Sequence, residues 1–321
     1  MTPCLLALDT STDCLAAALQ TPAGRCCVNE AGGALASARL VPLLMSLLAD
    51  AGVSLAQVQA IAFGQGPGAF TGLRTACAVT QGLAFAGNTP VLAVDSLLIV
   101  AEDARAQAAA AGLPTDGDWW VAMDARMDEV YAAAYRYTGA GSHTGDDSQT
   151  GEGGPIHAGG RAGWQQWLAP RLWTLPALVD SWAAAPPARV AGNALAAFAD
   201  RLPAPGARTW PTCADRAAAL LQLAVQAWHR GDRQPADQAL PLYLRDKVAQ
   251  TTAERQALRR ATGSATGSVA SSTASSVGGS VGGSSGGLSG GSSGDPATTA
   301  SPTRATAPSA NSPGAPGVLR T

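Results

Sequence analysis

The chain has 321 residues and a net charge of −2, and Lys247 is its only lysine, so arginine supplies nearly all of the positive charge. The arginines are scattered and form no basic stripe, which argues against a dedicated nucleic-acid-binding protein. The first twenty residues carry Asp9 and Asp13 but no basic residue, so they predict neither a signal peptide nor a membrane span, and a cytoplasmic protein is expected.

The opening segment, CLLALDTSTDCLAAALQ, predicts two strands joined by an acidic turn. Leu5–Leu8 and Leu15–Leu19 are short apolar runs, and the DTSTD between them is rich in turn-forming residues. An aspartate beside small hydroxyl residues can also hold a metal and a phosphate. In a hairpin turn the structural interpretation is favoured, and the other stays open.

A helix is predicted next over ASARLVPLLMSLLADAG, closed by Gly52. Because Pro42 has no N–H, it fits best in a first helical turn, which predicts a start at Ala38 or Arg39. The strand VQAIAFGQG then enters the glycine-rich loop, and a second helix is expected from an N-cap at Thr71 to about Ala86.

The glycine-rich stretch FGQGPGAFTGLRTACAVTQGLAF allows two interpretations. Glycine loops often hold phosphate, yet this one has no lysine that could reach one. Alternatively, Gly66, Gly68 and Gly72 permit positive φ angles and close packing of a helix on a strand. The packing interpretation is favoured.

The second part of the chain repeats the opening pattern. After the strand TPVLAVDSL and a helix over Leu97–Ala111, WWVAMDARMDEVYAAAYRY predicts two strands around the turn DARMDE. This similarity indicates a duplicated fold.

The elements that follow are less regular. A glycine-rich loop, Thr138–Gly163, precedes a predicted helix over GWQQWLAP and a strand over ARVAGNAL. The helix CADRAAALLQLAVQAWHRG is expected to pack back on the first unit, and PLYLRDKVA to be extended. From Ala261 to Thr321 the chain is mostly Ser, Gly, Ala, Thr and Pro, which predicts a disordered tail.

Metal and hydrolytic chemistry have little support in the sequence. The six cysteines show no C-x-x-C spacing and are expected to be core residues. His143, His157 and His229 form no pair at i, i+4 spacing and no serine–histidine–aspartate pattern. The sequence therefore predicts no metal site and no catalytic residue.

Four ordered motifs, ALDTST, AFGQGPGAFTGLRTACAVTQGLA, VAMDARMDEVYAAAY and PLYLRDKVA, resemble the bacterial TsaB (YeaZ) family over Leu5–Ala249. The GPGAFTGLR and DARMDEVY stretches are the most specific. The residues that carry the resemblance are Asp9, Thr10, Gly66, Pro67, Gly68, Phe70, Thr71, Gly72, Asp124, Arg126 and Glu129.

The resemblance implies an α/β fold of two related actin-like (ASKHA, ribonuclease H-like) domains, with mixed sheets flanked by helices. The first would span residues 1–100, completed by a return helix within 212–250, and the second 101–211. The catalytic paralogue, TsaD, carries two metal-binding histidines on a helix that corresponds to SARLVPLLMSLL, which has none. Some relatives keep one histidine where this chain has Ala36. The resemblance thus implies no metal and no cofactor.

The function implied is that of a non-catalytic scaffold subunit. It would pair with the TsaD-type subunit, which transfers threonylcarbamoyl to the adenosine next to the anticodon in tRNAs that read codons beginning with A. A TsaE-type ATPase would dock on the pair, and tRNA would be reached only through the complex. A stand-alone kinase or metallopeptidase of the same fold, or a homodimeric module unrelated to tRNA, stays open.

A partner surface is predicted because the helix over SARLVPLLMSLL is apolar nearly all round, whereas an exposed helix keeps one polar face. Leu40, Leu43 and Leu47 form one stripe, and a second is formed by Val41, Met45 and Leu48. Which stripe faces the partner stays open, as does coverage of both by loops of the same chain. The interface candidates are Leu40, Leu43, Leu44, Leu47, Leu73, Arg74 and Leu83.

Overall fold

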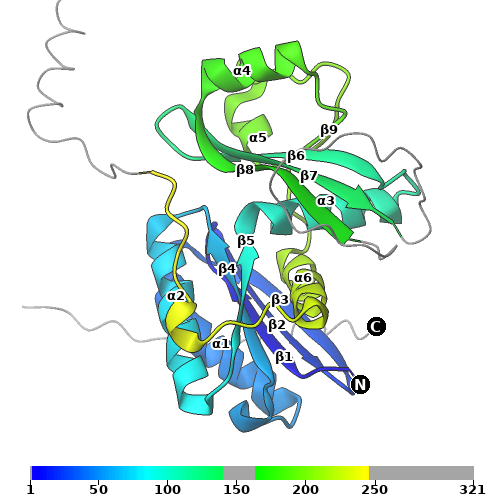
Figure 1. Cartoon of the computed structure of the whole chain (residues 1–321). Coiled ribbons are helices and arrows are strands. Elements are labelled where there is room, and N and C mark those ends of the chain that lie inside the picture. The colour runs from blue at the N-terminus through cyan, green and yellow to red at the C-terminus, as the bar shows by residue number, and fades with distance from the viewer. Residues whose placement is uncertain (1, 140–162, 246–321) are drawn as a thin grey trace, which may run out of the picture. The chain divides into compact units, whose positions relative to one another are not determined.

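The computed structural model describes residues 2–139 and 163–245, which form two five-stranded sheets with helices packed on their faces (Figure 1). The predicted α/β class with mixed sheets flanked by helices is confirmed. The predicted tail, Ala261–Thr321, lies outside the described residues, as do His143 and His157.

The first sheet has the strand order β3-β2-β1-β4-β5. Its strands are β1 (Leu5–Asp9), β2 (Cys14–Thr21), β3 (Gly24–Ala31), β4 (Ala60–Gly66) and β5 (Val91–Asp95). The central strand β1 pairs antiparallel with β2 and parallel with β4. Because the carboxyl ends of parallel strands meet at one edge, the acidic turn after β1 lies beside the glycine-rich loop after β4.

The second sheet repeats this topology. Its strands are β6 (Gly117–Asp124), β7 (Glu129–Thr138), β8 (Gly163–Thr174), β9 (Arg189–Ala191) and β10 (Arg208–Trp210). Their order is β10-β9-β6-β7-β8, so β6 is central, antiparallel to β7 and parallel to β9, as β1 is to β2 and β4. The repeat of strand, acidic turn and strand therefore reflects two sheets of the same connectivity.

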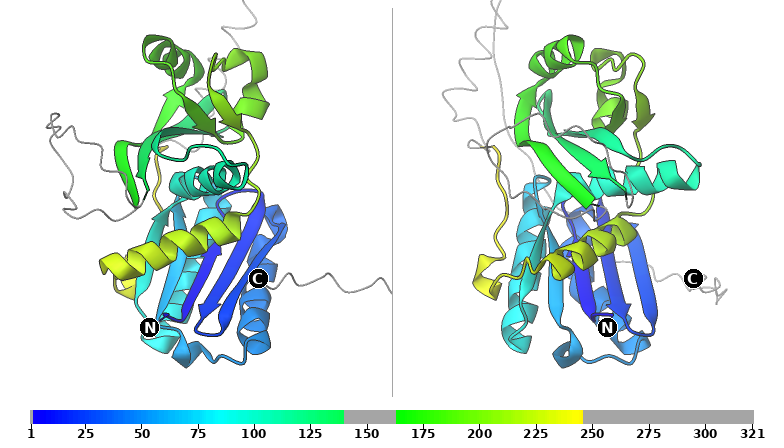
Figure 2. Two further views of the ribbon diagram at one scale, coloured as in Figure 1. Left: turned by 90° about the vertical axis from the view of Figure 1, so that its right-hand side faces the viewer. Right: turned by 45° about the vertical axis from the view of Figure 1, so that its right-hand side comes forward.

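Helices cover both faces of each sheet (Figure 2). They are α1 (Ala36–Asp50), α2 (Phe70–Gly87), α3 (Ser96–Ala110), α4 (Leu175–Ala184), α5 (Ala194–Phe198) and α6 (Arg216–Arg230). In the first sheet, α1 and α2 pack on one face and α6 on the other. In the second sheet, α4 and α5 pack on one face and α3 on the other. The domain limits predicted above stay a prediction.

Strand β1 shows how sequence and layering agree. Its residues, LLALD, are buried along the whole strand. Successive side chains of a strand point to opposite faces, so Leu6 and Leu8 pack with α1 and α2, while Leu5 and Ala7 pack with α6. A continuous apolar run is what a strand covered on both faces requires.

Three local predictions are corrected. GWQQWLAP is the start of strand β8 and not a helix: Trp164 and Trp167 have helical spacing, but the segment pairs antiparallel with β7 as an edge strand, where Pro170 is tolerated. Helix α1 begins at Ala36, so Pro42 lies beyond its first turn. Helix α2 begins at Phe70 after Ala69, and Thr71 is not its N-cap.

A partly buried hydrogen bond joins the two sheets. Asp95 ends β5 and caps α3 by accepting from the Leu97 N–H at 2.9 Å, and its other oxygen accepts from the Tyr135 hydroxyl of β7 at 2.5 Å. Burial raises the pKa of Asp95 to about 6, although hydrogen bonds from Tyr135 and Leu97 act in the opposite direction.

Candidate functional site

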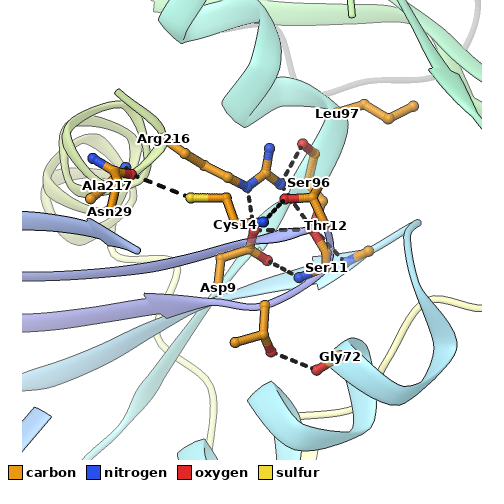
Figure 3. A network of polar contacts seen from close by, with 12 residues as sticks. Asp9, Ser11, Thr12, Cys14, Asn29, Gly72, Ser96, Leu97, Arg216 and Ala217 are labelled. Carbon is orange, nitrogen blue, oxygen red and sulfur yellow. Dashed lines mark hydrogen bonds and ion pairs between the residues drawn. The ribbon is translucent and has the colours of Figure 1, made fainter. Parts of the chain in front are cut away.

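The acidic turn between β1 and β2 is organised around Asp9, which is fully buried (Figure 3). One carboxylate oxygen accepts from the Ser11 backbone N–H at 3.3 Å, and the other accepts from the Ser11 hydroxyl at 3.0 Å. Both bonds are local, two residues along the chain, so Asp9 shapes the turn that follows it.

Arg216, the first residue of α6, neutralises this carboxylate. Its Nε donates to Asp9, and one terminal nitrogen donates to the Ser11 hydroxyl at 2.9 Å and to the Ser96 carbonyl at 3.3 Å (Figure 3). The Arg216 side chain is only 3% exposed and that of Asp9 is 0% exposed. Burial has the largest single effect on the pKa of Arg216 and lowers it, but the charges of Asp9 and Cys213 and the hydrogen bond to Asp9 together act in the opposite direction, and the pKa of the guanidinium is raised.

The start of α6 is itself fixed by polar contacts. Asp215 caps the helix by accepting from the Ala218 N–H at 3.0 Å. Asn29 of β3 donates to Asp215 at 2.8 Å and accepts from the Ala217 N–H at 3.0 Å. Asp103 of α3 accepts from the Asp215 N–H at 2.7 Å. These bonds hold Arg216 in position over the turn.

The glycine-rich loop packs directly on the acidic turn. A Cβ placed on Gly72 would lie 1.7 Å from the Thr10 carbonyl oxygen, and one on Gly68 would lie 2.4 Å from that of Ser11. The Thr10 hydroxyl donates to the Gly72 carbonyl at 2.7 Å, and the Ala69 N–H donates to the Ser11 carbonyl at 2.7 Å. The glycines are therefore needed for close approach.

This geometry does not fit the metal-bound phosphate that an actin-like fold would place at such a turn. The Asp9 carboxylate is buried and already paired with the guanidinium of Arg216. The glycine loop touches the turn, so no space for a phosphate lies between Gly72 and Thr10. The loop also offers no lysine.

The second sheet contains an equivalent close contact. A Cβ on Gly192 would lie 2.1 Å from the Ala122 carbonyl oxygen of β6. The neighbouring Asn193 side chain accepts from the Asp124 N–H at 2.9 Å. Gly192 and Asn193 of the VAGNAL stretch therefore pack against β6, just as the glycine-rich loop packs against the turn after β1.

The turn between β6 and β7 has an unusual backbone. Arg126, Met127 and Asp128 all have positive φ angles, of 65°, 58° and 58°. Residues with a side chain seldom adopt this conformation in succession, because each costs on the order of 1 kcal/mol. Arg245 supports the turn by donating to the Ala125 carbonyl at 3.0 Å and by pairing with Glu129 at 2.6 Å.

Burial changes the predicted partner surface. Leu40, Leu44, Leu47 and Leu73 are core residues of this chain, exposed by 4% or less, so their side chains do not form an outer surface. Leu43 and Leu83 are partly buried, and Arg74 is exposed.

The assignment of residues to the two predicted stripes of α1 is also corrected. Leu40, Leu44, Leu47 and Leu48 share the inner face at i, i+4, i+7 and i+8. Val41 and Met45, which are 39% and 38% exposed, point outward. Leu48 therefore belongs to the core, and the outer apolar residues of α1 are Val41 and Met45.

Arg216 is the residue that sequence reasoning missed. It lies 207 positions from Asp9, and no spacing rule connects the two. Its one signal is the Asp215–Arg216 pair at the start of a predicted helix, where an arginine is unexpected because the helix dipole disfavours a positive charge. Arg245 was within a family motif, PLYLRDKVA, but its contact with the β6–β7 turn could not be seen in the sequence.

The described residues offer neither a cluster of metal ligands nor a membrane-spanning helix. Across 2–139 and 163–245, no group of three or more His, Cys, Asp or Glu side chains could hold a metal ion. His229 is exposed at the end of α6. Among the helices in these ranges, none is both long and apolar enough to cross a membrane.

Comparison with known proteins gives consistent matches. The family model described as TsaD, tRNA N6-adenosine threonylcarbamoyltransferase, matches residues 33–149. The tRNA threonylcarbamoyladenosine biosynthesis protein TsaB of Haemophilus influenzae is 40% identical over 127 residues, which cover 40% of this chain and 51% of that protein. TsaB of Escherichia coli K12 is 33% identical over 132 residues, 41% of this chain and 54% of that protein. The match thus spans about half the length of these curated relatives.

Solved structures match over a longer range. A crystal structure of an uncharacterized Pseudomonas aeruginosa protein with similarity to peptidase YEAZ is 36% identical, with a TM-score of 0.60, and the match covers 76% of this chain and 100% of that chain. A second structure, YeaZ from Pseudomonas aeruginosa, is also 36% identical, with a TM-score of 0.59, covering 75% of this chain and 100% of that one. Full coverage of these relatives, at this identity and with the same fold, shows that the chain belongs to the TsaB/YeaZ family.

Proposed function

We propose that this chain is a non-catalytic subunit in the biosynthesis of threonylcarbamoyladenosine in tRNA. It would pair with a TsaD-type catalytic subunit, which transfers threonylcarbamoyl to the adenosine next to the anticodon in tRNAs that read codons beginning with A. A TsaE-type ATPase would act on the pair, and tRNA would be bound through the complex. The names of the TsaB relatives and the match to the TsaD family model support this pathway.

The observation that carries the non-catalytic role is the ion pair between Asp9 and Arg216. A carboxylate at the end of β1 could act on a metal or a phosphate only if it were accessible. Here it is fully buried and neutralised by a guanidinium from the same chain. The Asp9 carboxylate thus serves the internal structure of this subunit.

The partner surface proposed here is the outer face of α1. Val41 and Met45 lie one turn apart on this face and are both more than a third exposed. Leu35, just before the helix, is 61% exposed. Apolar side chains gathered on one face are typical of surfaces that a partner covers. Whether a second copy of this chain competes for the same face is decided by the experiment below.

The experiment measures binding of the purified chain to the purified TsaD-type subunit of the same organism by titration calorimetry. Met45→Glu should abolish binding while leaving the melting temperature and circular dichroism intact, because the side chain is outside the core. Ala177→Glu, an exposed position on α4, is the matched control and should bind normally.

Two outcomes would contradict the proposal. A purified monomer that binds ATP at micromolar concentration would favour the alternative of a nucleotide-dependent enzyme of the same fold. Self-association in the centrifuge, lost in Met45→Glu, with no binding of the catalytic subunit would favour a homodimeric module.

A further inference from the structure

The chain continues after α6 as an extended segment, residues 239–245, which we call the strap. It begins against α2 of the first sheet and ends at the turn between β6 and β7 of the second sheet (Figure 1). The Gln81 side chain of α2 donates to the Ala239 carbonyl at 3.2 Å, and the Leu242 N–H donates to the Gln65 carbonyl at 2.7 Å. The first half of the strap is therefore fixed to α2 and to the end of β4.

Arg245 fixes the other end of the strap to the second sheet. One of its terminal nitrogens donates to the carbonyls of Ala125 and Arg126, at 3.0 and 3.3 Å, and pairs with the Glu129 carboxylate at 2.6 Å. The other terminal nitrogen lies 2.9 Å from the Met127 sulfur. The side chains of Arg245 and Glu129 are 15% and 28% exposed. One arginine thus holds two backbone carbonyls and a carboxylate of the same turn.

The β6–β7 turn has few other contacts that would keep its shape. Arg126, Met127 and Asp128 are all left-handed, a conformation that residues with a side chain adopt at a cost. The Glu129 N–H donates to the Arg126 carbonyl at 3.2 Å, across the turn itself. The ion pair of Asp128 with Arg201 is exposed on both sides, and such pairs contribute little. The turn therefore depends on the end of the strap.

The end of the strap is the third place at which the two sheets are connected. The chain passes from the first sheet to the second where β5 ends at Asp95, and it returns through residues 211–215 before α6. Polar contacts lie next to both passages: Tyr135 donates to Asp95 at 2.5 Å, and the Asp215 N–H donates to Asp103 at 2.7 Å. Two connections leave rotation about the line that joins them, and we call this pair of passages the hinge. A third attachment prevents that rotation.

This third attachment can open at little cost to the core. The middle of the strap is not buried, since Leu240 and Tyr243 are 54% and 43% exposed. The ion pair between Arg245 and Glu129 is partly exposed, so salt weakens it. The carbonyls that Arg245 releases can bind water, and the turn is then free to leave its left-handed conformation. The attachment therefore has the properties of a two-state element.

We propose that the end of the strap is a conformational latch between the two sheets. In the closed state Arg245 binds Glu129 and the carbonyls of the β6–β7 turn, and the two sheets have a fixed relative orientation. In the open state Arg245 is released, the turn relaxes, and the second sheet with its helices rotates about the hinge. The latch belongs to the free chain, so it does not depend on the proposed function.

The test measures the relative orientation of the two sheets in the full chain, from NMR residual dipolar couplings of the backbone amides. In the unaltered protein at low salt, one alignment should fit the couplings of both sheets. Arg245→Gln removes the charge and the fork, so the second sheet should turn by several degrees or require an alignment of its own. Arg230→Gln, which removes the exposed pair with Asp232 at the end of α6, is the matched control and should keep the single alignment.

Two further measurements use the same readout. Glu129→Gln should turn the second sheet in the same direction as Arg245→Gln, because it removes the other half of the ion pair. In the unaltered protein, about 1 M NaCl shortens the Debye length to about 3 Å and should also shift the orientation. If neither variant folds, this salt titration decides alone, and an unchanged orientation overturns the inference.

A purely structural role of Arg245 gives a different result. If Arg245→Gln and Glu129→Gln are folded and both keep the orientation of the unaltered protein, the latch is refuted, even where their melting temperatures fall. Arg245 would then support only the turn. No partner is present in these measurements, so failure of the latch leaves the proposed function standing, and failure to bind the TsaD-type subunit leaves the latch standing.

Discussion

Replacing Arg216 with methionine tests whether the acidic turn is internal structure. The substitution keeps most of the side-chain length but removes the guanidinium, which leaves the Asp9 carboxylate buried without its counter-charge. Removing one partner of a buried ion pair costs about 3–5 kcal/mol, because the remaining charge is desolvated and unpaired. Both side chains are exposed by 3% or less, so this range applies without a reduction for solvent screening. For a folded part of this size, the melting temperature should fall by roughly 10 °C.

The assay is urea unfolding at pH 7 followed by circular dichroism. In Arg216→Met the Asp9 carboxylate is buried without a counter-charge, so the free energy of unfolding should fall by the amount given above. The double variant Asp9→Asn with Arg216→Met should recover at least half of the lost stability, because no charge stays buried. A loss below about 1 kcal/mol at pH 7, or no recovery in the double variant, would show that the pair does not hold the turn.

Three further predictions concern other contacts of the fold, and the first of them includes a control substitution. Gly72→Ala should destabilise the fold by several kcal/mol, because its Cβ would lie 1.7 Å from the Thr10 carbonyl oxygen. Gly82→Ala, in the same helix but with open space around it, is the control and should stabilise the fold by about 0.5–1 kcal/mol. Thermal unfolding measures both. Because the pKa of Asp95 is raised to about 6 in the folded protein, the free energy of unfolding of the unaltered protein should fall by about 2 kcal/mol as the pH rises from 4 to 7. Asp95→Asn should not show this fall, and equal pH profiles of the two proteins would contradict the prediction. Arg245→Ala should increase hydrogen exchange in the β6–β7 turn but not in α1. Unchanged exchange in the turn would show that the turn needs no support from Arg245.

Much of the fold could be predicted because its central strands are short apolar runs with turn residues at their ends. Leu5–Leu8 and the acidic turn were predicted in this way, as were β6 and β7 around DARMDE. Strand β8 was misread because Trp164 and Trp167 have helical spacing, and only the pairing of the segment with β7 makes it a strand. Long-range pairing thus overrode the local pattern.

The site was harder to predict than the fold. The glycine-rich loop was consistent with either phosphate binding or close packing. The sequence alone favoured close packing but did not identify the segment that packs against the loop. The missing partner was the acidic turn, in contact through Gly72 and Thr10. Arg216 was not foreseen at all, because a contact across 207 positions leaves no local pattern. On α1, two apolar stripes were predicted but Leu48 was assigned to the wrong one, because its i+8 spacing from Leu40 places it on the inner face.

The central claim is that this chain supports threonylcarbamoyl transfer without performing it. The most direct measurement is the threonylcarbamoyladenosine content of tRNA, by nucleoside mass spectrometry, in cells depleted of this protein and supplied with variants. The account predicts that depletion lowers the modified nucleoside, that the unaltered chain restores it, and that Met45→Glu does not restore it although the variant is folded. Normal levels of the modified nucleoside after depletion would contradict the account.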